Sequence, residues 1–318
     1  MFDTKKPISD VDVVIVGGGL AGLTAALYAG RANLRVMLLE HHTVGGHVAF
    51  MEHVDNYPGF PHGISGFQLA KAVEDHACRY RLRLVRGEVN ALNIDYDGDM
   101  FVETDDHIIY GKAMVLAPGS SPRPLACPGA QRWEGQGLYY RTGIEGALFQ
   151  DQIVAVIGGG DGALTHALML GKYARQVILI HRGRALQAEA ALQDQLTEYP
   201  AITTLLETEV TAVLGEEQLE GVQVRHRKTD QPDYLKVDSC VVSIGQTPNT
   251  AFLHGIVDLD ENGYIWVDQR LQTSRDGIFA AGDARQYSVH TVASAVGDGS
   301  VAGINARNYV LTHSESNS

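Results

Sequence analysis

Residues 12–40 read DVVIVGGGLAGLTAALYAGRANLRVMLLE, and this stretch decides the fold. An apolar strand over residues 12–16 runs into a glycine-rich turn and an apolar helix over 23–29. A second apolar strand over 34–39 ends on Glu40. This order of strand, GxGxxG, helix, strand and acid is typical of a βαβ unit that binds a dinucleotide. A purely structural glycine turn would not need the strands, the helix and the acid at these positions.

Each glycine of the turn has a separate physical role. Gly17 allows the tight turn, Gly19 lets the backbone approach a pyrophosphate, and Gly22 lets the helix pack closely on the strand. The helix N-terminus offers unpaired N–H groups and a partial positive charge to phosphates. At the tip of the second strand, Glu40 can accept hydrogen bonds from ribose hydroxyls.

Composition excludes several classes of function. The chain has 318 residues, enough for about two domains, and a net charge of -13, which argues against nucleic acids and anionic membranes. The start, residues 1–10, is polar, and no apolar run approaches the roughly 18 residues of a membrane span. Three cysteines, far apart in sequence, predict a reducing, cytoplasmic setting rather than a disulfide scaffold. The histidines between residues 41 and 62 follow no ligand spacing, so we expect no metal site.

The opening pattern occurs a second time. A strand over 152–157 leads into Gly158-Gly159-Gly160-Asp161-Gly162-Ala163, a helix over 164–170 and a strand over 177–180. Gly158 lies 158 − 17 = 141 positions after Gly17, and the flanking apolar residues match at the same offset. The repeat indicates that a whole domain is duplicated, which predicts either two dinucleotide sites or one site that has decayed.

The two copies differ where the ribose is recognised. At the offset of 141, Glu40 corresponds to His181, which Arg182 follows. An acid suits a ribose 2′-hydroxyl, whereas an arginine suits a 2′-phosphate. The first copy therefore predicts an FAD site, and the second favours NADP(H). The candidate residues of the second site are Gly158, Gly160, Asp161, Gly162, Ala163, His181, Arg182 and Arg184; for Asp161, helix capping is the alternative.

Six motifs stand in an order that resembles the low-molecular-weight thioredoxin reductases and their relatives. The resemblance implies an α/β fold of two Rossmann-like, three-layer ββα domains, the second inserted into the first. It places the FAD domain at 1–121 and 241–318 and the NAD(P)H-type domain at 122–240. Independently, the prolines at 122, 124 and 128 predict a linker from 121 to 129. The resemblance also implies a homodimer. The motifs are Gly17–Gly22, Gly45-Gly46-His47, Asn56-Tyr57-Pro58-Gly59, Gly158–Ala163, Ile244–Asn249 and Ala280-Ala281-Gly282-Asp283.

The same resemblance implies roles around the flavin. Asp283 would hydrogen-bond the ribityl and phosphate region, and a helix beginning near Val292 would direct its N-terminus at the N1/O2 edge of the ring. The candidate FAD residues are Gly17, Gly19, Leu20, Ala21, Gly22, Glu40, His41, Gly46, His47, Asn56, Val89, Ala117, Gly119, Gly282, Asp283, His290, Thr291 and Val292.

The chain departs from this family at several positions, among them Ala117-Pro118-Gly119, His290-Thr291-Val292 and His47, and two further departures bear most directly on function. The Cys-x-x-Cys position reads Arg141-Thr142-Gly143-Ile144, and without a nucleophilic and a resolving thiol side by side we do not predict thioredoxin reduction. The family's His-Arg-Arg with a later arginine becomes His181-Arg182-Gly183 with Gln187, which predicts a weaker grip on a 2′-phosphate. No catalytic side chain is assigned, since the flavin would carry the chemistry.

These observations favour an FAD-dependent oxidoreductase that passes electrons between NAD(P)H and an unidentified small-molecule or protein partner. Ferredoxin or flavodoxin–NADP reductases are the nearest family precedent without the dithiol. One alternative is a flavoprotein whose second site holds a second FAD or another nucleotide, with Tyr139 and Tyr140 stacking on a ring rather than packing in a core. Another is a flavin-binding sensor without turnover. Cys127 is either redox-active or incidental.

Overall fold

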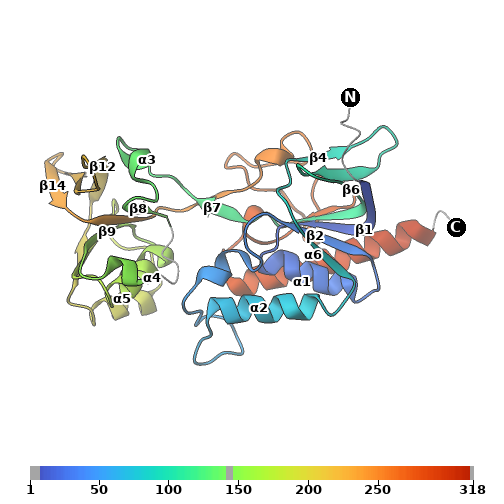
Figure 1. The fold of residues 1–318 in the computed structure, drawn as a ribbon, viewed down its shortest axis with the longest axis horizontal. Helices are drawn as coiled ribbons and strands as arrows, with labels where there is room; N and C mark the ends of the chain where they lie inside the picture. The colour runs from blue at the N-terminus through green and yellow to red at the C-terminus, as the bar shows by residue number, and fades with distance from the viewer. Residues whose placement is uncertain (1–7, 141–145, 316–318) are drawn as a thin grey trace. The chain divides into compact units, whose positions relative to one another are not determined.

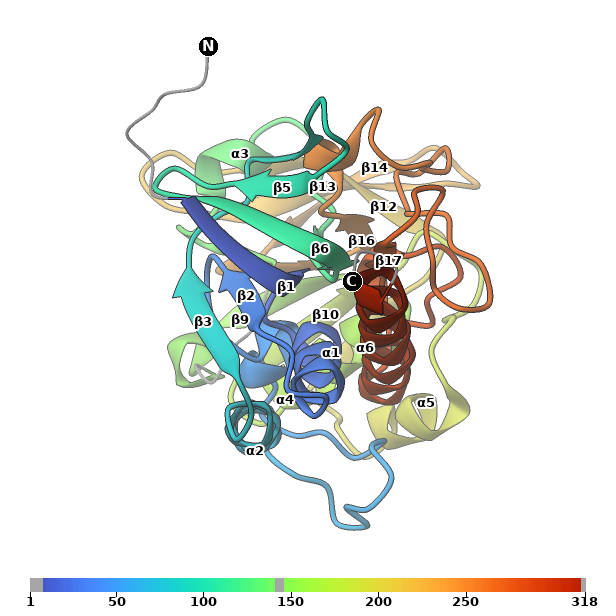
Figure 2. The ribbon, with the colours of Figure 1, turned by 90° about the vertical axis from the view of Figure 1, so that its right-hand side faces the viewer.

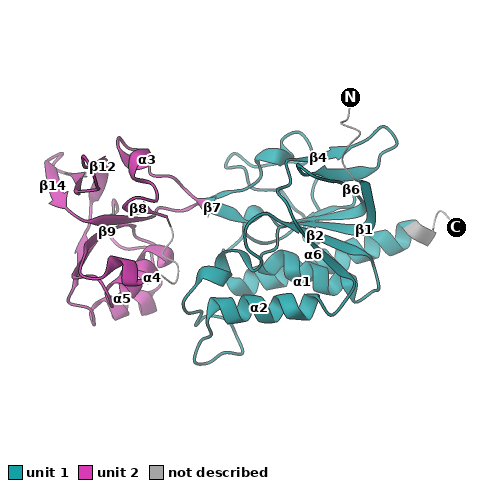
Figure 3. Cartoon of the chain, in the orientation of Figure 1, with its two compact units in different colours: residues 1–121, 247–318 teal, residues 122–246 magenta. Residues whose placement is uncertain are grey.

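The computed structural model describes residues 8–140 and 146–315, and the chain divides into two compact units. Unit 1 comprises Met1–Ser121 and Thr247–Ser318, and unit 2 comprises Pro122–Gln246 (Figures 1 and 3). The expected second boundary at residue 240 is too early. β15 (Ser239–Ser243) pairs with strands of unit 2, so the chain returns to unit 1 only after Gln246.

Unit 1 is built on a mixed sheet whose parallel strands come from both ends of the chain. β3 (Leu82–Arg86), β2 (Val36–Glu40), β1 (Ile8–Val16) and β6 (Ile108–Leu116) lie side by side. The far edge of β6 pairs along its first half with the antiparallel hairpin β5 (Met100–Glu103) and β4 (Ala91–Ile94), and along its second half with β17 (Ile278–Ala280).

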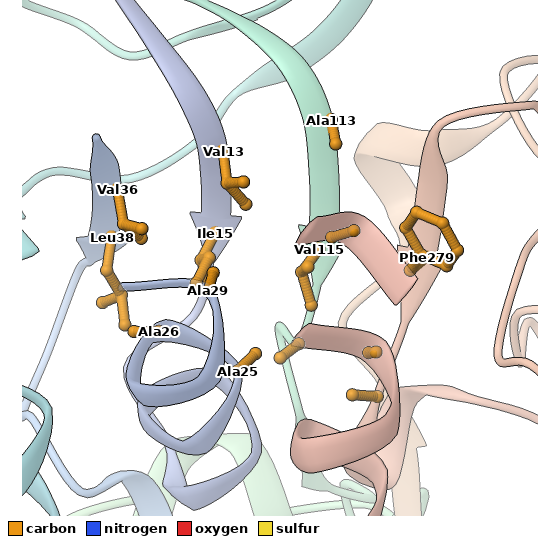
Figure 4. Close-up of a cluster of buried hydrophobic side chains, with 14 of the residues drawn as sticks. Val13, Ile15, Ala25, Ala26, Ala29, Val36, Leu38, Ala113, Val115 and Phe279 are labelled. Carbon is orange, nitrogen blue, oxygen red and sulfur yellow. The ribbon is translucent and has the colours of Figure 1, made fainter. Parts of the chain in front are cut away.

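Three helices cover one face of this sheet: α1 (Leu20–Gly30), α2 (Gly66–Ala77) and α6 (Val292–Glu315) (Figure 2). Side chains alternate along each strand, so Val13 and Ile15 pack against α1 and α6, whereas Val14 and Val16 enter a second core on the opposite face. The helix-side core is shown in Figure 4, where strand side chains meet alanines of α1.

Glycines allow α6 to approach α1 closely. A Cβ at Gly299 would collide with the carbonyl oxygen of Ala21, and one at Gly303 would lie 2.6 Å from the carbonyl oxygen of Ala25. Burial of Ala302 and Ala306 completes this contact. The first helix after the glycine turn is thus held by the last helix of the chain.

Unit 2 repeats the arrangement. Its sheet has the order β11 (Ile202–Leu205), β10 (Gln176–Ile180), β9 (Ile153–Gly158), β15 and β8 (Leu138–Tyr139), all parallel. One core packs this sheet on α4 (Asp161–Leu170) and α5 (Ala190–Leu196). The other packs it on α3 (Ala130–Trp133) and an antiparallel sheet of β12 (Thr208–Leu214), β13 (Gly221–His226) and β14 (Pro232–Lys236).

Short elements complete the chain. The two crossings between the units pair with each other as β7 (Ser120–Pro122) and β16 (Gln246–Pro248). The 3-10 turns among the described residues are η1 (Gly46–Phe50), η2 (Gly146–Phe149), η3 (Ala251–Leu253) and η4 (Gly282–Ala284). No helix in the described part of the chain is long and apolar enough to cross a membrane.

The importance of the α1–α6 contact for stability can be tested with two glycines of α6. We expect Gly299→Ala to lower the free energy of unfolding by about 1–3 kcal/mol, because the added methyl collides with backbone. Gly297→Ala is the matched control. A Cβ at Gly297 meets nothing within 4 Å, so alanine should leave stability unchanged or raise it by up to about 1 kcal/mol. Urea unfolding of the two variants measures this, and equal stabilities would contradict it.

Candidate nucleotide-binding sites

The carboxyl ends of the parallel strands bring the first set of candidate residues to one edge of the unit 1 sheet. Backbone bonds join Gly17 N to Leu39 O at 2.8 Å, Ala117 N to Val16 O at 2.8 Å and Ala281 N to Leu116 O at 2.9 Å. Four segments far apart in sequence therefore meet here: the first glycine loop (Gly17–Gly22), Glu40, Ala117 with Gly119, and η4. Ligands of open α/β sheets bind at this edge.

The glycines of the first loop serve different purposes. Gly17 has φ +101°, and a Cβ there would collide with the carbonyl oxygen of Ala117; a Cβ on Gly22 would collide with the carbonyl oxygen of Gly17. At Gly19, by contrast, a Cβ would meet nothing within 4 Å. Gly19 is the N-cap of α1 and no side chain caps this helix, so the first N–H groups of the helix have no side-chain acceptor beside the open space at Gly19. This arrangement fits a phosphate.

The Glu40 carboxylate is hydrogen-bonded to the first glycine loop. Its Oε2 accepts a hydrogen bond from Gly18 N at 2.7 Å, and its Oε1 accepts one from His42 N at 2.7 Å. The carboxylate is held in place while each oxygen keeps a further lone pair for a ribose hydroxyl. The ring of His41 stacks on His42 and its Nδ1 lies 3.0 Å from the Glu88 carboxylate.

Other candidate residues of the first site lie at different distances from the loop. Gly45 N donates to Gly18 O at 2.8 Å, which brings Gly46 and the start of η1, with His47, against Gly19. Gly119 has φ +68°, and its carbonyl accepts from Asn249 N at 3.0 Å. Val89 packs at the edge of the second core, and Asn56 is exposed on a separate loop with no hydrogen bond to the first glycine loop among the described residues.

A buried ion pair that the sequence did not predict holds η4. Both oxygens of Asp298, on α6, accept from the Arg285 guanidinium, at 2.6 and 2.8 Å, and Asp298 Oδ2 also accepts from Gly282 N at 3.0 Å. Asp298 is buried, so its charge is compensated within this network. Gly282 in turn lies against Ala21 of α1. The pair thus fixes the turn that carries Asp283.

The residues before α6 form a compact cap. The Oγ1 of Thr291 accepts from Ser294 N at 3.1 Å, and the Ser294 Oγ accepts from Thr291 N at 3.2 Å, a reciprocal cap that starts the helix at Val292. His290 has φ +53°, a conformation that side chains rarely adopt, and its Nδ1 lies 3.5 Å from Asp283 Oδ1. The hydrogen bond with the Asp283 carboxylate raises the pKa of His290.

The second glycine loop (Gly158–Ala163) repeats the geometry of the first. A Cβ on Gly158 would collide with the carbonyl oxygen of Ser243, whereas one on Gly160 would meet nothing within 4 Å. Gly160 is the N-cap of α4, which also lacks a side-chain cap, and Gly162 lies against the Ser243 hydroxyl. Asp161 does not cap α4: its Oδ1 accepts from Glu189 N at 2.8 Å and so holds the start of α5.

His181 occupies the place that Glu40 has in unit 1. A Cβ on Gly159 would collide with its ring, as one on Gly18 would approach Glu40 at 2.9 Å. The ring is buried and its Nε2 has no hydrogen-bond partner among the described residues. An orphaned polar atom beneath a phosphate-type loop fits a bound nucleotide. Beyond it, Arg182 is exposed, and Arg184 Nε lies 3.3 Å from the Glu207 carboxylate.

The remaining candidates pack within unit 2. Tyr139 meets Phe149 edge-on at 5.5 Å between ring centroids, and the Tyr140 hydroxyl accepts from Leu125 N at 3.0 Å, so both belong to unit 2 packing. Burial raises the pKa of the Cys127 thiol, which opposes a reactive thiolate. The segment Arg141–Ile144 lies outside the described residues. In the described part of the chain, no cluster of three His, Cys, Asp or Glu residues could hold a metal.

Two Rossmann-like units, each with an uncapped helix facing a glycine loop, define a fold that holds two dinucleotides. Residues 11–299 match the family model described as pyridine nucleotide-disulphide oxidoreductase, and the chain belongs to this family. It is therefore an oxidoreductase of the thioredoxin reductase-like class, in which FAD and NADPH are the expected cofactors. The resemblance to thioredoxin reductases predicted from the motifs is confirmed.

Relatives match over almost the whole chain. A 34.2 kDa protein in a rubredoxin operon of Clostridium pasteurianum is 35% identical over 96% of this chain and 99% of its own length. The thioredoxin reductase of Mycolicibacterium smegmatis is 35% identical over 94% of this chain and 96% of its own. The thioredoxin reductase of Lactococcus lactis superposes with a TM-score of 0.92 and 29% identity, over 95% of this chain and 99% of that one.

A buried histidine on the helix of the second site, α4, should make the stability of the fold depend on pH. On α4, His166 Nδ1 is buried and has no hydrogen-bond partner in the described part of the chain, and burial lowers the pKa of His166 from 6.5 to about 4. Between those values the unfolded chain takes up a proton that the folded protein does not, so folding weakens as pH falls. Between about pH 7 and about pH 4.5, we expect the free energy of unfolding to fall by about 2 kcal/mol less in His166→Gln than in the native protein. Urea unfolding at the two pH values measures the difference. Equal losses would contradict this.

Proposed function

We propose that unit 1 binds FAD and that unit 2 binds a nicotinamide dinucleotide, so that the protein transfers electrons between NAD(P)H and a further acceptor through the flavin. The observation that carries this proposal is that Gly19 and Gly160 have the same geometry in their respective units. Both leave open space at the N-cap of an uncapped helix, yet one loop lies against Glu40 and the other against His181, which the exposed Arg182 follows. The difference in charge supports FAD in unit 1 and a nicotinamide dinucleotide in unit 2.

When bound, FAD supplies the ability to accept electrons in pairs and release them singly or in pairs. The residues of the chain position it. The N-terminus of α1 would hold the pyrophosphate, Glu40 the ribose hydroxyls, and Asp283, fixed through the Arg285–Asp298 pair, the ribityl region. The capped N-terminus of α6 at Val292 would place a partial positive charge at the ring edge that becomes negative on reduction.

The acceptor is proposed to take electrons without a protein dithiol. The chain contains cysteines only at 78, 127 and 240, and the position of the family's Cys-x-x-Cys reads Arg141-Thr142-Gly143-Ile144. A disulfide relay needs two neighbouring thiols, so the thioredoxin reduction that names many relatives is not proposed here. A small redox protein that takes electrons directly from the flavin fits better, as in ferredoxin or flavodoxin reductases. We also propose a homodimer, by the same resemblance.

Anaerobic mixing separates the proposal from its alternatives. The purified chain is loaded with FAD, its flavin content is counted after denaturation, and NADPH or NADH is added while the visible flavin absorbance is followed. One FAD per chain and rapid bleaching support the proposal. Two flavins per chain without bleaching would favour a second FAD in unit 2, and one flavin that no donor reduces would favour a sensor. Light scattering of the same sample reports the oligomeric state.

Reciprocal variants test the assignment of the two sites. Gly19→Val is expected to abolish FAD retention, and Gly160→Val to leave FAD bound but abolish bleaching by NAD(P)H, because each side chain enters the space reserved for phosphate. Since neither Cβ meets protein atoms within 4 Å, both variants should fold. Circular dichroism checks the fold. If Gly160→Val also released FAD, or if Gly19→Val kept it, the assignment would be wrong.

A further inference from the structure

The edge of unit 2 that would receive the ribose 2′ group carries more charge than the sequence motif indicates. Three arginines gather around the segment after β10: Arg182, Arg184 and, from the end of β13, Arg227, whose Nη1 donates to the Arg182 carbonyl oxygen at 3.5 Å. Two carboxylates accompany them, Glu207 and Glu209. The net attraction for a phosphate therefore depends on which arginines are already paired.

Glu207 is fixed against this segment by its backbone. Its N–H donates to the Gly183 carbonyl oxygen at 2.9 Å, and its own carbonyl oxygen accepts from Arg227 N at 2.7 Å. Its φ is +49°, a conformation that a glutamate rarely adopts and that the two flanking bonds maintain. The carboxylate thus stays beside the segment, where its Oε1 lies 3.3 Å from Arg184 Nε.

The other carboxylates pair with the other arginines. Glu209 lies 2.6 Å from Arg225 and 3.7 Å from Arg227, and Asp230 lies 3.3 Å from Arg225. Over the described residues, no ion pair involves Arg182. A 2′-phosphate would then find one arginine without a carboxylate, and would have to compete with Glu207 for Arg184.

We propose that Glu207 is a specificity-determining residue of unit 2: by occupying Arg184 and adding a negative charge beside it, Glu207 weakens the discrimination in favour of a 2′-phosphorylated dinucleotide, so that NAD(H) competes with NADP(H). This inference rests on the proposed nicotinamide site. It names a residue outside the glycine loop and outside the arginine motif, contributed by the segment between β11 and β12.

The test is a double-mutant cycle read by binding rather than turnover. The FAD-loaded full chain is titrated calorimetrically with NADP+ and with NAD+, and the ratio of the two Kd values is compared among the native protein, Glu207→Gln, Arg184→Gln and the double variant. We expect Glu207→Gln to shift the ratio toward NADP+ by about three- to tenfold. Arg184→Gln alone should change it by less than about twofold, since Glu207 already pairs with that arginine, and should reduce the gain of Glu207→Gln, because the part of that gain that comes from freeing Arg184 is lost.

Glu74→Gln is the matched control. Glu74 is a partly exposed glutamate paired with Lys71 on α2 of unit 1, so this variant makes the same change in net charge away from unit 2 and should keep the native ratio. A ratio unchanged in Glu207→Gln, or a gain as large in the double variant as in Glu207→Gln alone, would overturn the proposed role of Glu207. If the native chain bound neither dinucleotide, the nicotinamide site itself would fail, and the inference with it.

Discussion

The structure depends on how closely the glycine turns after β1 in unit 1 and after β9 in unit 2 pass the end of a neighbouring strand. At Gly17 and Gly158 the added Cβ would collide with the carbonyl oxygens of Ala117 and Ser243, and both residues have φ in the left-handed region. This contact aligns the start of the following helix with the strand ends. Glu40, Ala117 and η4 in unit 1, and His181 in unit 2, lie around the start of that helix.

The two units combine the same backbone arrangement around the glycine loop with side chains of different charge. In each, a loop beyond the second strand returns over the glycine loop: Gly45 N bonds Gly18 O at 2.8 Å, and Gln187 N bonds Gly159 O at 2.7 Å. The residue beneath is an anchored carboxylate in one unit and a buried imidazole in the other. Since the backbone is shared, discrimination between ligands has to come from side chains at the rim.

The α/β class, the duplication and the glycine loops were predictable because they depend on local order and fixed spacing. The Arg285–Asp298 pair and the Arg184–Glu207 pair were not, because charged residues far apart in sequence follow no periodicity that identifies their partners. The boundary at residue 240 was misplaced for a similar reason. An apolar strand followed by Gly245 reads equally well as the last strand of one unit or the first of the next, and only its pairing with β9 decides.

The insertion of unit 2 is compatible with a first unit built from both chain ends because its own ends are joined. β7 and β16 pair, and within unit 1 the Asn249 side chain bonds Ser121 and the Pro118 carbonyl oxygen at 2.8 and 3.0 Å. A flexible loop would cost only about 0.6 kcal/mol for each doubling of its length. A folded insert whose two ends are adjacent costs less loop-closure entropy still, because the distance between its ends is fixed and does not grow with the number of inserted residues. The contact of α6 with α1 is therefore kept although residues 122–246 intervene.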